Sequence, residues 1–482
     1  MRSPAISLLF VVLMLLPAAS TIGQTVTPEN WSPTWVNPSW ERPANMVADG
    51  AISLPGDLAA DGLENTGICG GCHNAILAQW KGSMHANALI DPIFQAATKL
   101  FLSEVTAEGD REEALACVRC HTPFGHLSKT AETTAADYAA ATETLGTRSG
   151  IFCDFCHSVQ ASAGVGNAPF LVDAADGGDA QKIKRGPRTD AVSPYHATAF
   201  SDLHTKSEMC GMCHDVTHTF NGMPIERTYT EWRESPYNTG DPASTVYCQD
   251  CHMRQLPGVP ATGSTARADN PGVSAPGGRE RAHIFTHYLV GANAAIPALF
   301  DSGEQNAAIA YENLQNCATI EITTPPYPAV WQNADIQVRV HNVGAGHYLP
   351  TGLSEVREMW LEILVKDAGG RTIFQSGGVD GEGNLDSQAR LFNIVLADKE
   401  GNHTINVAMA DRIVSDTRIP PKGYRIEHYT FFVPLRGILG YTVEARLQYR
   451  SAPQSTINAL LGSAAPTLPI IEMTSASAEV RF

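Results

Sequence analysis

The sequence predicts an α+β protein of two domains, in which a mainly helical and loop-rich domain precedes an antiparallel β-sandwich. The chain has 482 residues, which exceeds what one compact core ordinarily requires. Ten of its eleven cysteines belong to one recurring motif before residue 318, and short β-rich runs follow that residue. We divide the chain into a signal peptide, an extended arm and two domains: residues 1–23, 24–67, 68–317 and 318–482.

The first residues have the pattern of a secretory signal. Arg2 gives a short positive start, and an apolar run extends from about Ala5 to Leu16. Small residues such as Ala19 and Gly23 follow and suit cleavage. The run is too short to span a bilayer, and no later stretch reaches the roughly 20 apolar residues that a transmembrane helix requires. We therefore expect export without a transmembrane segment, to a periplasmic or a cell-surface, extracellular location.

The predicted arm combines bulky aromatic residues with prolines, which disfavour regular structure. Its tryptophans and neighbouring prolines are Trp31, Pro33, Trp35, Pro38, Trp40 and Pro43. Three tryptophans are rarely left in water, so we expect the arm to pack on the following domain or, alternatively, on a neighbouring molecule.

The pentapeptide CxxCH occurs five times after the arm. Its cysteines are Cys69, Cys72, Cys117, Cys120, Cys153, Cys156, Cys210, Cys213, Cys248 and Cys251. Its histidines are His73, His121, His157, His214 and His252. CxxCH is the attachment signature of c-type haem. Two cysteines three positions apart reach the two vinyl groups on one porphyrin edge, and the adjacent histidine becomes the proximal iron ligand.

A single CxxCH would also suit a redox dithiol or half of a zinc site. Five copies in one exported chain instead predict five c-type haems with their iron. Residues 68–317 are therefore expected to form a pentahaem cytochrome c domain, in which haem supplies much of the core.

Each haem iron has a second axial position, and histidines are abundant enough to fill all five. The chain has 16 histidines, so eleven remain after the five proximal ones are removed. Seven of these lie within the haem domain: His85, His126, His196, His204, His218, His283 and His287. Methionine is the competing ligand, and Met84 is the methionine best placed for that role.

Several longer strings carry a family resemblance. GIFCDFCHSV, SPYHATAFSDLHTKSEMCGMCHDV, RTYTEWRESPY, YCQDCHM and HYLVGAN resemble a large family of multihaem c-type cytochromes. That family includes the tetrahaem cytochromes that take electrons from hydroxylamine oxidoreductase. The resemblance covers roughly residues 65 to 295. The fifth CxxCH and the β-domain depart from the tetrahaem pattern, which leaves the partner open.

The resemblance also implies distal ligands. WKGSMHANA is similar to the first distal-ligand segment of the family, which implies His85. The same analogy implies His196, His204 and His287, with His283 and His126 in reserve. VGAGHYLPTG resembles a segment found where such haem domains are fused to a β-domain, so His347 is the fifth distal candidate. A turn histidine with only structural contacts is the alternative interpretation of His347.

Composition and capping signals predict helices between the motifs. They cover residues 73–89, 91–105, 133–145, 205–213, 228–234 and 303–317. Asp91 and Pro92 form an N-cap and first-turn pair. Residues 255–278 are rich in Pro, Gly, Ser and Thr and are expected to form a surface loop.

The second domain is predicted from six runs with alternating or β-rich character. They cover residues 318–323, 335–343, 358–367, 371–376, 424–433 and 441–450. Turns that contain glycine, asparagine or proline separate them. Short strands of this kind over such a length are typical of an antiparallel β-sandwich.

The formal net charge of −17 makes nucleic acid an unsuitable partner, because binding it requires a basic surface. Such acidity fits redox partner proteins with a cationic docking face. It would also be explained by solubility alone. The chain has neither a nucleotide-binding loop nor a nucleophile constellation, so no catalytic residue is assigned.

Two weaker signals lie near and beyond the domain boundary. Cys317 is the odd cysteine, either a buried residue at the start of the first strand or an intermolecular link. VDGEGNLD spaces oxygen ligands two apart, as calcium loops do. It lacks the glycine and glutamate positions of an EF-hand, so we interpret it as an acidic β-turn.

Together these observations predict an exported pentahaem c-type cytochrome that carries electrons along mostly bis-His haems to or from a redox partner. The alternative is a multihaem reductase or other oxidoreductase of a small nitrogen or sulfur compound at one five-coordinate haem. A third hypothesis is a homo-oligomer or larger assembly that docks through haem edges and the tryptophan-rich arm.

Overall fold

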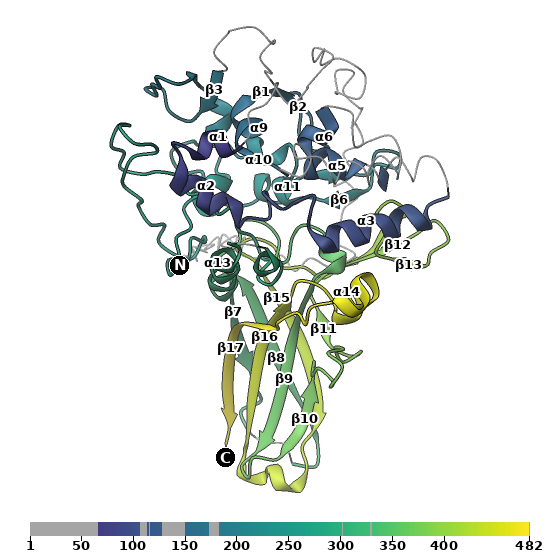
Figure 1. Ribbon diagram of the computed structural model, residues 1–482. Helices are drawn as coiled ribbons and strands as arrows, with labels where there is room; N and C mark the ends of the chain where they lie inside the picture. The colour runs from purple at the N-terminus through teal and green to yellow at the C-terminus, as the bar shows by residue number, and fades with distance from the viewer. Residues whose placement is uncertain are drawn as a thin grey trace, which may run out of the picture.

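The computed structural model describes residues 66–106, 113–114, 116–127, 150–172, 183–300, 302–327 and 330–481. The predicted signal peptide, the tryptophan-rich arm and the predicted helix over 133–145 lie outside the described residues. Short helices and loops form one part of the molecule, and long strands run away from it (Figure 1). The combination of helices and antiparallel sheets is that of an α+β protein. The division into two domains at residue 318 stays a prediction.

The N-terminal part, up to residue 317, is built from short helices, and every CxxCH motif lies in a helix or at its edge. The helices are α1 Thr66–Gly70, α2 Asn74–Lys81, α3 Pro92–Glu104, α5 Val118–His121, α6 Pro123–Leu127, α9 Cys153–Ser158, α10 Glu208–Gly211, α11 Thr228–Arg233, α12 Cys248–His252 and α13 Glu304–Gln315. The 3₁₀ turns η3 Asp202–Thr205 and η4 Ile296–Leu299 also lie here. A helical turn brings both cysteines and the histidine of a motif to one side of the backbone.

Small strand pairs connect these helices. They are antiparallel β1 Val159–Ser162 with β2 Phe170–Val172, parallel β3 Ile183–Gly186 with β4 Ala197–Phe200, and antiparallel β5 Val216–Thr217 with β6 Pro224–Glu226. The sequence analysis did not predict these strands. Runs of two to four residues are too short for a period of two to stand out.

Helix predictions were correct where local caps dominate. Asp91 caps α3, because its carboxylate accepts a hydrogen bond of 2.8 Å from the backbone N–H of Ile93. The predicted helices over 228–234 and 303–317 correspond to α11 and α13. Of the predicted helix over 205–213, only the four residues of α10 are α-helical.

The predicted helix over 73–89 was wrong beyond Lys81. Residues 82–90 form turns and a bend instead. At Gly82 an added Cβ would lie 2.1 Å from the carbonyl oxygen of Ser302, so the backbone approaches that segment closely. This tertiary contact, which the local composition does not reveal, ends the helix.

All six predicted β-rich runs form strands. The long strands are β7 Ala318–Thr323, β8 Asn333–Asn342, β9 Glu358–Asp367, β10 Thr372–Ser376, β15 Tyr424–Phe432, β16 Tyr441–Arg450 and β17 Ile471–Val480. Shorter elements are β11 Arg390–Leu391, β12 Ile394–Ala397, β13 His403–Thr404, β14 Arg412–Asp416 and α14 Gln454–Leu461, with the 3₁₀ turns η5 Ser354–Val356, η6 Leu435–Leu439 and η7 Gly462–Ala464.

Two antiparallel sheets enclose one core in this C-terminal part. One sheet has the order β10-β9-β16-β17, with β11 beside β9, and the other has the order β15-β8-β7. Inward side chains such as Ile336 and Val338 of β8 share a single cluster with Val443 and Leu447 of β16. All four are fully buried, as expected where two sheets pack face to face.

The two parts are joined by shared apolar clusters. Met223 and Ile225 of the N-terminal part pack with Ile394 and Leu396 of β12, which belongs to the small sheet β13-β12-β14. Ile93 of α3 packs against the cluster beside α14, and Figure 1 shows these two helices together. Burial of this apolar surface fixes how the β-strands sit on the helical part.

Cys317 and the acidic turn, the two weaker signals of the sequence, make local contacts. Cys317 packs against the β-core, and its thiol donates to the carbonyl oxygen of Asn313 at 3.0 Å. Asp380 accepts hydrogen bonds from the backbone N–H groups of Glu382 and Asn384, which closes the acidic turn on itself. In the described ranges, no helix has the length and apolar character needed to cross a membrane.

Candidate haem sites

The motif cysteines are available for covalent attachment. All eleven cysteines lie among the described residues and are free thiols. Within these ranges, which hold every histidine too, no group of three or more His, Cys, Asp or Glu side chains could hold a metal ion. The zinc alternative therefore has no site in the described part of the chain.

Each of the five motif histidines is oriented by a hydrogen bond at Nδ1. In four of them Nδ1 donates to a backbone carbonyl oxygen. The pairs are His73 with Ser274 at 2.8 Å, His121 with Ala88 at 3.0 Å, His157 with Arg185 at 2.6 Å, and His252 with Val290 at 2.9 Å. Such a bond fixes the tautomer and leaves Nε2 as the lone-pair donor. No protein atom of the described ranges hydrogen-bonds to Nε2 of a motif histidine, so these residues fit the haem iron.

The fifth motif histidine has a different partner. Nδ1 of His214 lies 3.2 Å from Oε1 of Glu226, at the end of β6. Burial lowers the pKa of His214, but the hydrogen bond and the charge of Glu226 raise it to about 9. Burial raises the pKa of Glu226, whereas the hydrogen bond and charge of His214 bring it below its ordinary value. The pair is thus a charge-assisted hydrogen bond, with the Glu226 side chain partly buried.

Three predicted distal histidines face a motif histidine. The ring centroids are 5.8 Å apart for His204 and His157, 6.4 Å for His347 and His252, and 6.0 Å for His85 and His214. The interplanar angles are 21°, 20° and 60° in the same order. Two metal–nitrogen bonds of about 2 Å, with the ring radii added, would separate the centroids by about 6 Å. These spacings suit an iron between each pair.

His85 is held by a close backbone approach. The backbone N–H of Ile151 donates to its carbonyl oxygen at 2.9 Å. Gly150 has a positive φ of 57°, and a Cβ there would lie 2.3 Å from the same oxygen. Burial, followed by the charges of His214 and His252, lowers the pKa of His85 to about 3. Its imidazole is therefore neutral, as a metal ligand must be.

His204 differs from the other facing histidines. Its Nε2 lies 2.9 Å from the carbonyl oxygen of Cys156, while its Nδ1 is buried without a partner. Nδ1 is thus the nitrogen that the protein leaves unused. Burial, with the charge of His157, lowers the pKa of His204 to about 4.

His347 enters the N-terminal part from the loop that follows β8. Its Nδ1 donates to the carbonyl oxygen of Tyr348 at 2.9 Å, and its own carbonyl accepts from Asn342 at 2.8 Å. The backbone N–H of Tyr348 donates to Oε2 of Glu231 at 3.1 Å. Glu231, on α11, ties this loop to the N-terminal part.

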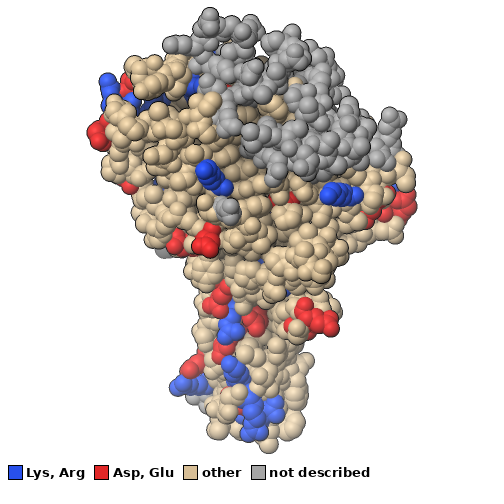
Figure 2. All heavy atoms as spheres, in the orientation of Figure 1, with Lys and Arg blue, Asp and Glu red and all other residues tan. Residues whose placement is uncertain are grey.

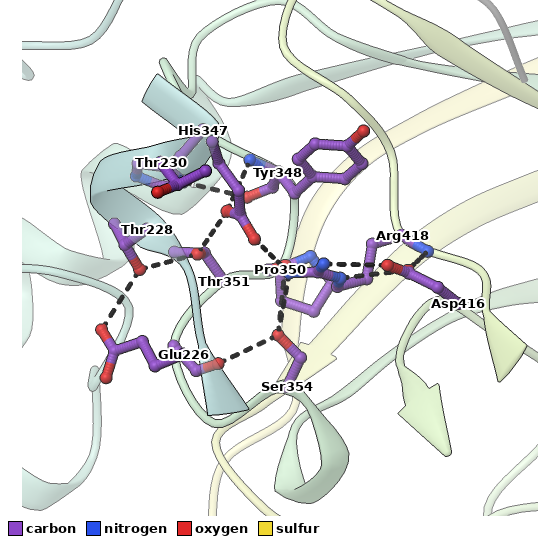
Figure 3. A network of polar contacts seen from close by, with 12 residues as sticks. Glu226, Thr228, Thr230, His347, Tyr348, Pro350, Thr351, Ser354, Asp416 and Arg418 are labelled. Atoms are coloured by element: carbon purple, nitrogen blue, oxygen red, sulfur yellow. Dashed lines mark hydrogen bonds and ion pairs between the residues drawn. The ribbon is translucent and has the colours of Figure 1, made fainter. Parts of the chain in front are cut away.

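Arg418 completes this anchor with a buried ion-pair network. It pairs with Glu231 at 2.5 Å and with Asp416 at 2.8 Å, and all three side chains are almost fully buried. Thr351 also donates to Glu231, at 2.7 Å. Figure 3 shows Thr351, Arg418 and Asp416 around the loop that carries His347.

The remaining histidine candidates lack a facing ring. His287 donates from Nδ1 to Phe285, and burial, followed by the charges of His157 and His73, lowers its pKa to about 4. It thus lies near the first and third motifs. His196 donates from Nδ1 to Ala197 at 3.1 Å and is half-buried.

The two reserve candidates make other contacts. His283 accepts from Asn270 at Nδ1 and keeps a buried Nε2 without a partner. His126 packs edge-on against Phe170. His218 uses both ring nitrogens, because Nε2 donates to Ala408 and Nδ1 accepts from Phe220, which leaves no lone pair for iron.

His121 has an aromatic ring stacked on the face of its imidazole. The ring of Phe94, on α3, stacks on it with centroids 3.8 Å apart and planes within 4°. Among the described residues, no histidine ring faces His121. Sequence reasoning missed both Phe94 and Glu226, because neither stands at a spacing that a haem motif defines.

Cysteines of different motifs lie side by side. The side chains of Cys69 and Cys153, of Cys120 and Cys213, and of Cys210 and Cys248 are in hydrogen-bond contact. The first motif therefore neighbours the third, and the fourth neighbours both the second and the fifth. Cys156 of the third motif also lies near Cys213 of the fourth. The five motifs form one continuous cluster.

Comparison with known proteins indicates the class of protein. Residues 68–158, which hold the first three motifs, match the model of the family "Cytochrome c554 and c-prime". No curated protein sequence matches the chain. A solved penta-heme cytochrome c552 from Thermochromatium tepidum is 20% identical, with a TM-score of 0.58 over 87% of this chain and 99% of that one. At that identity the likeness concerns the fold.

A second solved structure matches part of the chain. It is the CARDB domain of a Pyrococcus furiosus protein, at 13% identity over 34% of this chain and 85% of that one, with a TM-score of 0.16. The family match, the fold shared with a penta-heme cytochrome and the repeated CxxCH motifs support a multihaem c-type cytochrome.

Proposed function

We propose that the chain is an exported pentahaem c-type cytochrome that carries electrons between redox partner proteins along mostly bis-His haems. The observation that carries the proposal is the set of facing histidine pairs at centroid distances of 5.8, 6.0 and 6.4 Å. Histidine on both sides of an iron leaves no open position for a substrate, and this suits electron transfer.

The chain's own residues hold and shield the redox groups. The haems would supply reversible one-electron chemistry when bound. The motif cysteines would fix them covalently, and hydrogen bonds at Nδ1 hold each proximal imidazole in one orientation. His85 and His347 are half-buried, which limits the access of water to these ligands.

The contacts between motifs support transfer from site to site. Cys69 meets Cys153, and Cys120 and Cys248 both meet cysteines of the fourth motif. A haem attached at each motif would therefore have a neighbouring haem. Electrons could enter at one end of this cluster and leave at the other without a diffusing carrier.

The surface charge supports a protein partner with a cationic face. The net charge is −17, and two propionates on each haem would add to it. On the face that Figure 2 shows, acidic side chains occur in small groups, and along the strands they alternate with Lys and Arg. Docking would then weaken as ionic strength rises. The predicted signal peptide supports a periplasmic or cell-surface location.

A specific observation favours a second candidate function. No histidine ring faces His121 in the described ranges, and Phe94 stacks on the face of its imidazole, beside the nitrogen that would bind iron. A haem held there would keep an open position for a small nitrogen or sulfur compound. The second candidate is therefore a reductase or oxidoreductase that works at the second motif.

Low-temperature EPR of the oxidised protein, recorded with and without nitrite, hydroxylamine or cyanide, separates the two functions. The carrier function predicts low-spin signals that none of these compounds changes. A stoichiometric high-spin signal that shifts on addition, together with turnover of the compound, would replace the carrier by the enzyme. The variant Phe94→Ala then tests the location, because it should alter that signal and no low-spin one.

A further inference from the structure

The proximal histidines differ in the charge of the group that receives their Nδ1 proton. Four of them donate to backbone carbonyl oxygens, which are neutral. His214 alone among the five donates to a carboxylate, that of Glu226, at 3.2 Å. A negatively charged acceptor increases the basicity of the imidazole that binds the metal.

The fold holds Glu226 in place for this contact. Glu226 pairs with Val216 across the small sheet of β6 and β5, next to the fourth motif. Thr228 donates to the same oxygen, Oε1, at 3.2 Å and shares a hydrogen bond of 2.8 Å with Thr351 (Figure 3). The side chain of Glu226 is 17% exposed, so solvent screens its charge weakly.

Among the described residues, no lysine or arginine forms an ion pair with Glu226. In the described part of the chain, its ion pair is with His214. The adjacent Arg227 turns to Asp215 instead, at 2.9 Å. A partly buried negative charge next to a metal ligand favours the oxidation state with the higher positive charge.

We propose that Glu226 lowers the reduction potential of the haem iron bound by His214 and makes it the last of the five to be reduced. Reduction adds one electron to the ferric iron, breaks no bond and leaves the proton on Nδ1 of His214. The carboxylate stabilises the ferric state more than the ferrous state, because the ferric iron carries one more positive charge.

The position of the fourth motif gives this tuning a consequence for electron flow. Cys213 contacts Cys120 of the second motif, and Cys210 contacts Cys248 of the fifth. A haem of low reduction potential at the fourth motif passes electrons on to its neighbours and does not store them. Electrons therefore rest on the other haems, which include those of the second, third and fifth motifs beside it. This inference rests on haem binding as proposed above and deepens that function.

An EPR-monitored redox titration of the intact cytochrome with Glu226→Gln tests the proposal, because glutamine keeps the shape and removes the charge. The component of lowest potential should shift upward by at least about 59 mV, a tenfold change in a one-electron equilibrium constant. The other four components should move less. The proposal is overturned if the lowest component stays within the error of the wild type while five haems are retained.

Two further variants make the result specific. Glu208→Gln removes a charge from α10, close to Cys210, without a contact to His214, and should give a clearly smaller shift. Glu226→Asp keeps the charge and should restore most of the low potential. An equal shift in the Glu208 variant would overturn the specific role of Glu226. A haem count on each sample tests the proposed haem binding separately. Fewer than five haems in the wild type would show that at least one motif binds no haem.

Discussion

His252 and His347 lie with their rings nearly parallel, 20° apart in orientation and 6.4 Å apart between centroids. His252 ends the last CxxCH motif on α12, whereas His347 belongs to the loop after β8. The strand-rich C-terminal part therefore supplies a side chain to a candidate haem site in the N-terminal part. This explains why the two parts are joined by a buried ion-pair network as well as by apolar clusters.

The variant His347→Ala should remove one axial ligand without removing a haem, because the cysteines of the fifth motif remain. EPR of the oxidised protein should then show the loss of one low-spin component relative to the wild type and a new high-spin signal. The exposed His403 on β13 offers a matched control, and His403→Ala should leave the spectrum unchanged. An unchanged spectrum in the His347 variant would exclude this histidine as a ligand.

Removal of the buried charge of Arg418 should lower the stability of the fold more than removal of an exposed arginine. Arg418→Met would leave Glu231 and Asp416 buried without their partner, which costs about 3–5 kcal/mol of unfolding free energy. Urea unfolding followed by far-UV circular dichroism measures this loss. Arg412→Met is the control, because the side chain of Arg412 is 51% exposed and its removal should change stability by about 0.5 kcal/mol or less. Equal midpoints for the two variants would contradict the network's role.

The stability of the protein should depend on pH through Glu355. Burial raises the pKa of this carboxyl from 4.5 to about 7, while Arg357 opposes the shift, and Oε1 has no hydrogen-bond partner. At pH values between 4.5 and about 7, the unfolded chain has released this proton while the folded chain still keeps it. The folded state is therefore penalised as pH rises, by about 3 kcal/mol above pH 7 and hardly at all below the unfolded pKa.

Glu355→Gln removes that ionisation. The variant should gain about 3 kcal/mol relative to the wild type at pH 8 and show little gain at pH 4.5, measured by urea unfolding. Glu400→Gln, at an exposed position, is the control and should show no such dependence. A constant difference between Glu355→Gln and the wild type at both pH values would disprove the assignment.

Gly150 should be required for the position of His85. Its φ of 57° and the 2.3 Å approach of an added Cβ to the carbonyl oxygen of His85 leave no room for alanine. Gly150→Ala should therefore destabilise the fold by more than about 1 kcal/mol and perturb one low-spin EPR component. Gly258 has a φ of 76° but open space around it, so Gly258→Ala should leave that component intact.

Sequence reasoning succeeded where the determinants are local. Alternation of apolar and polar residues located β8 and β16, and an aspartate before a proline located the start of α3. It failed beyond Lys81, where the contact of Gly82 with Ser302 ends α2, and at the short strands β1 to β6. The first failure depends on a contact between segments that are distant in the chain, whereas the short strands have only two to four residues, too few for a period of two to stand out.

The candidate site was likewise predicted only in part from the sequence. Spacing identified every CxxCH residue, and resemblance suggested His85, His204 and His347, which the structure places opposite motif histidines. Neither source indicated which histidine faces which motif. Glu226 and Phe94 contact motif histidines only through tertiary packing, so no sequence pattern indicates them.

If one chain holds five haems that exchange electrons, as proposed, coulometric reduction of the purified protein and a pyridine-haemochrome count on the same sample will show it. We expect five haems and five reversibly exchanged electrons per chain. Fewer than five haems, or fewer electrons than haems, would contradict the proposal.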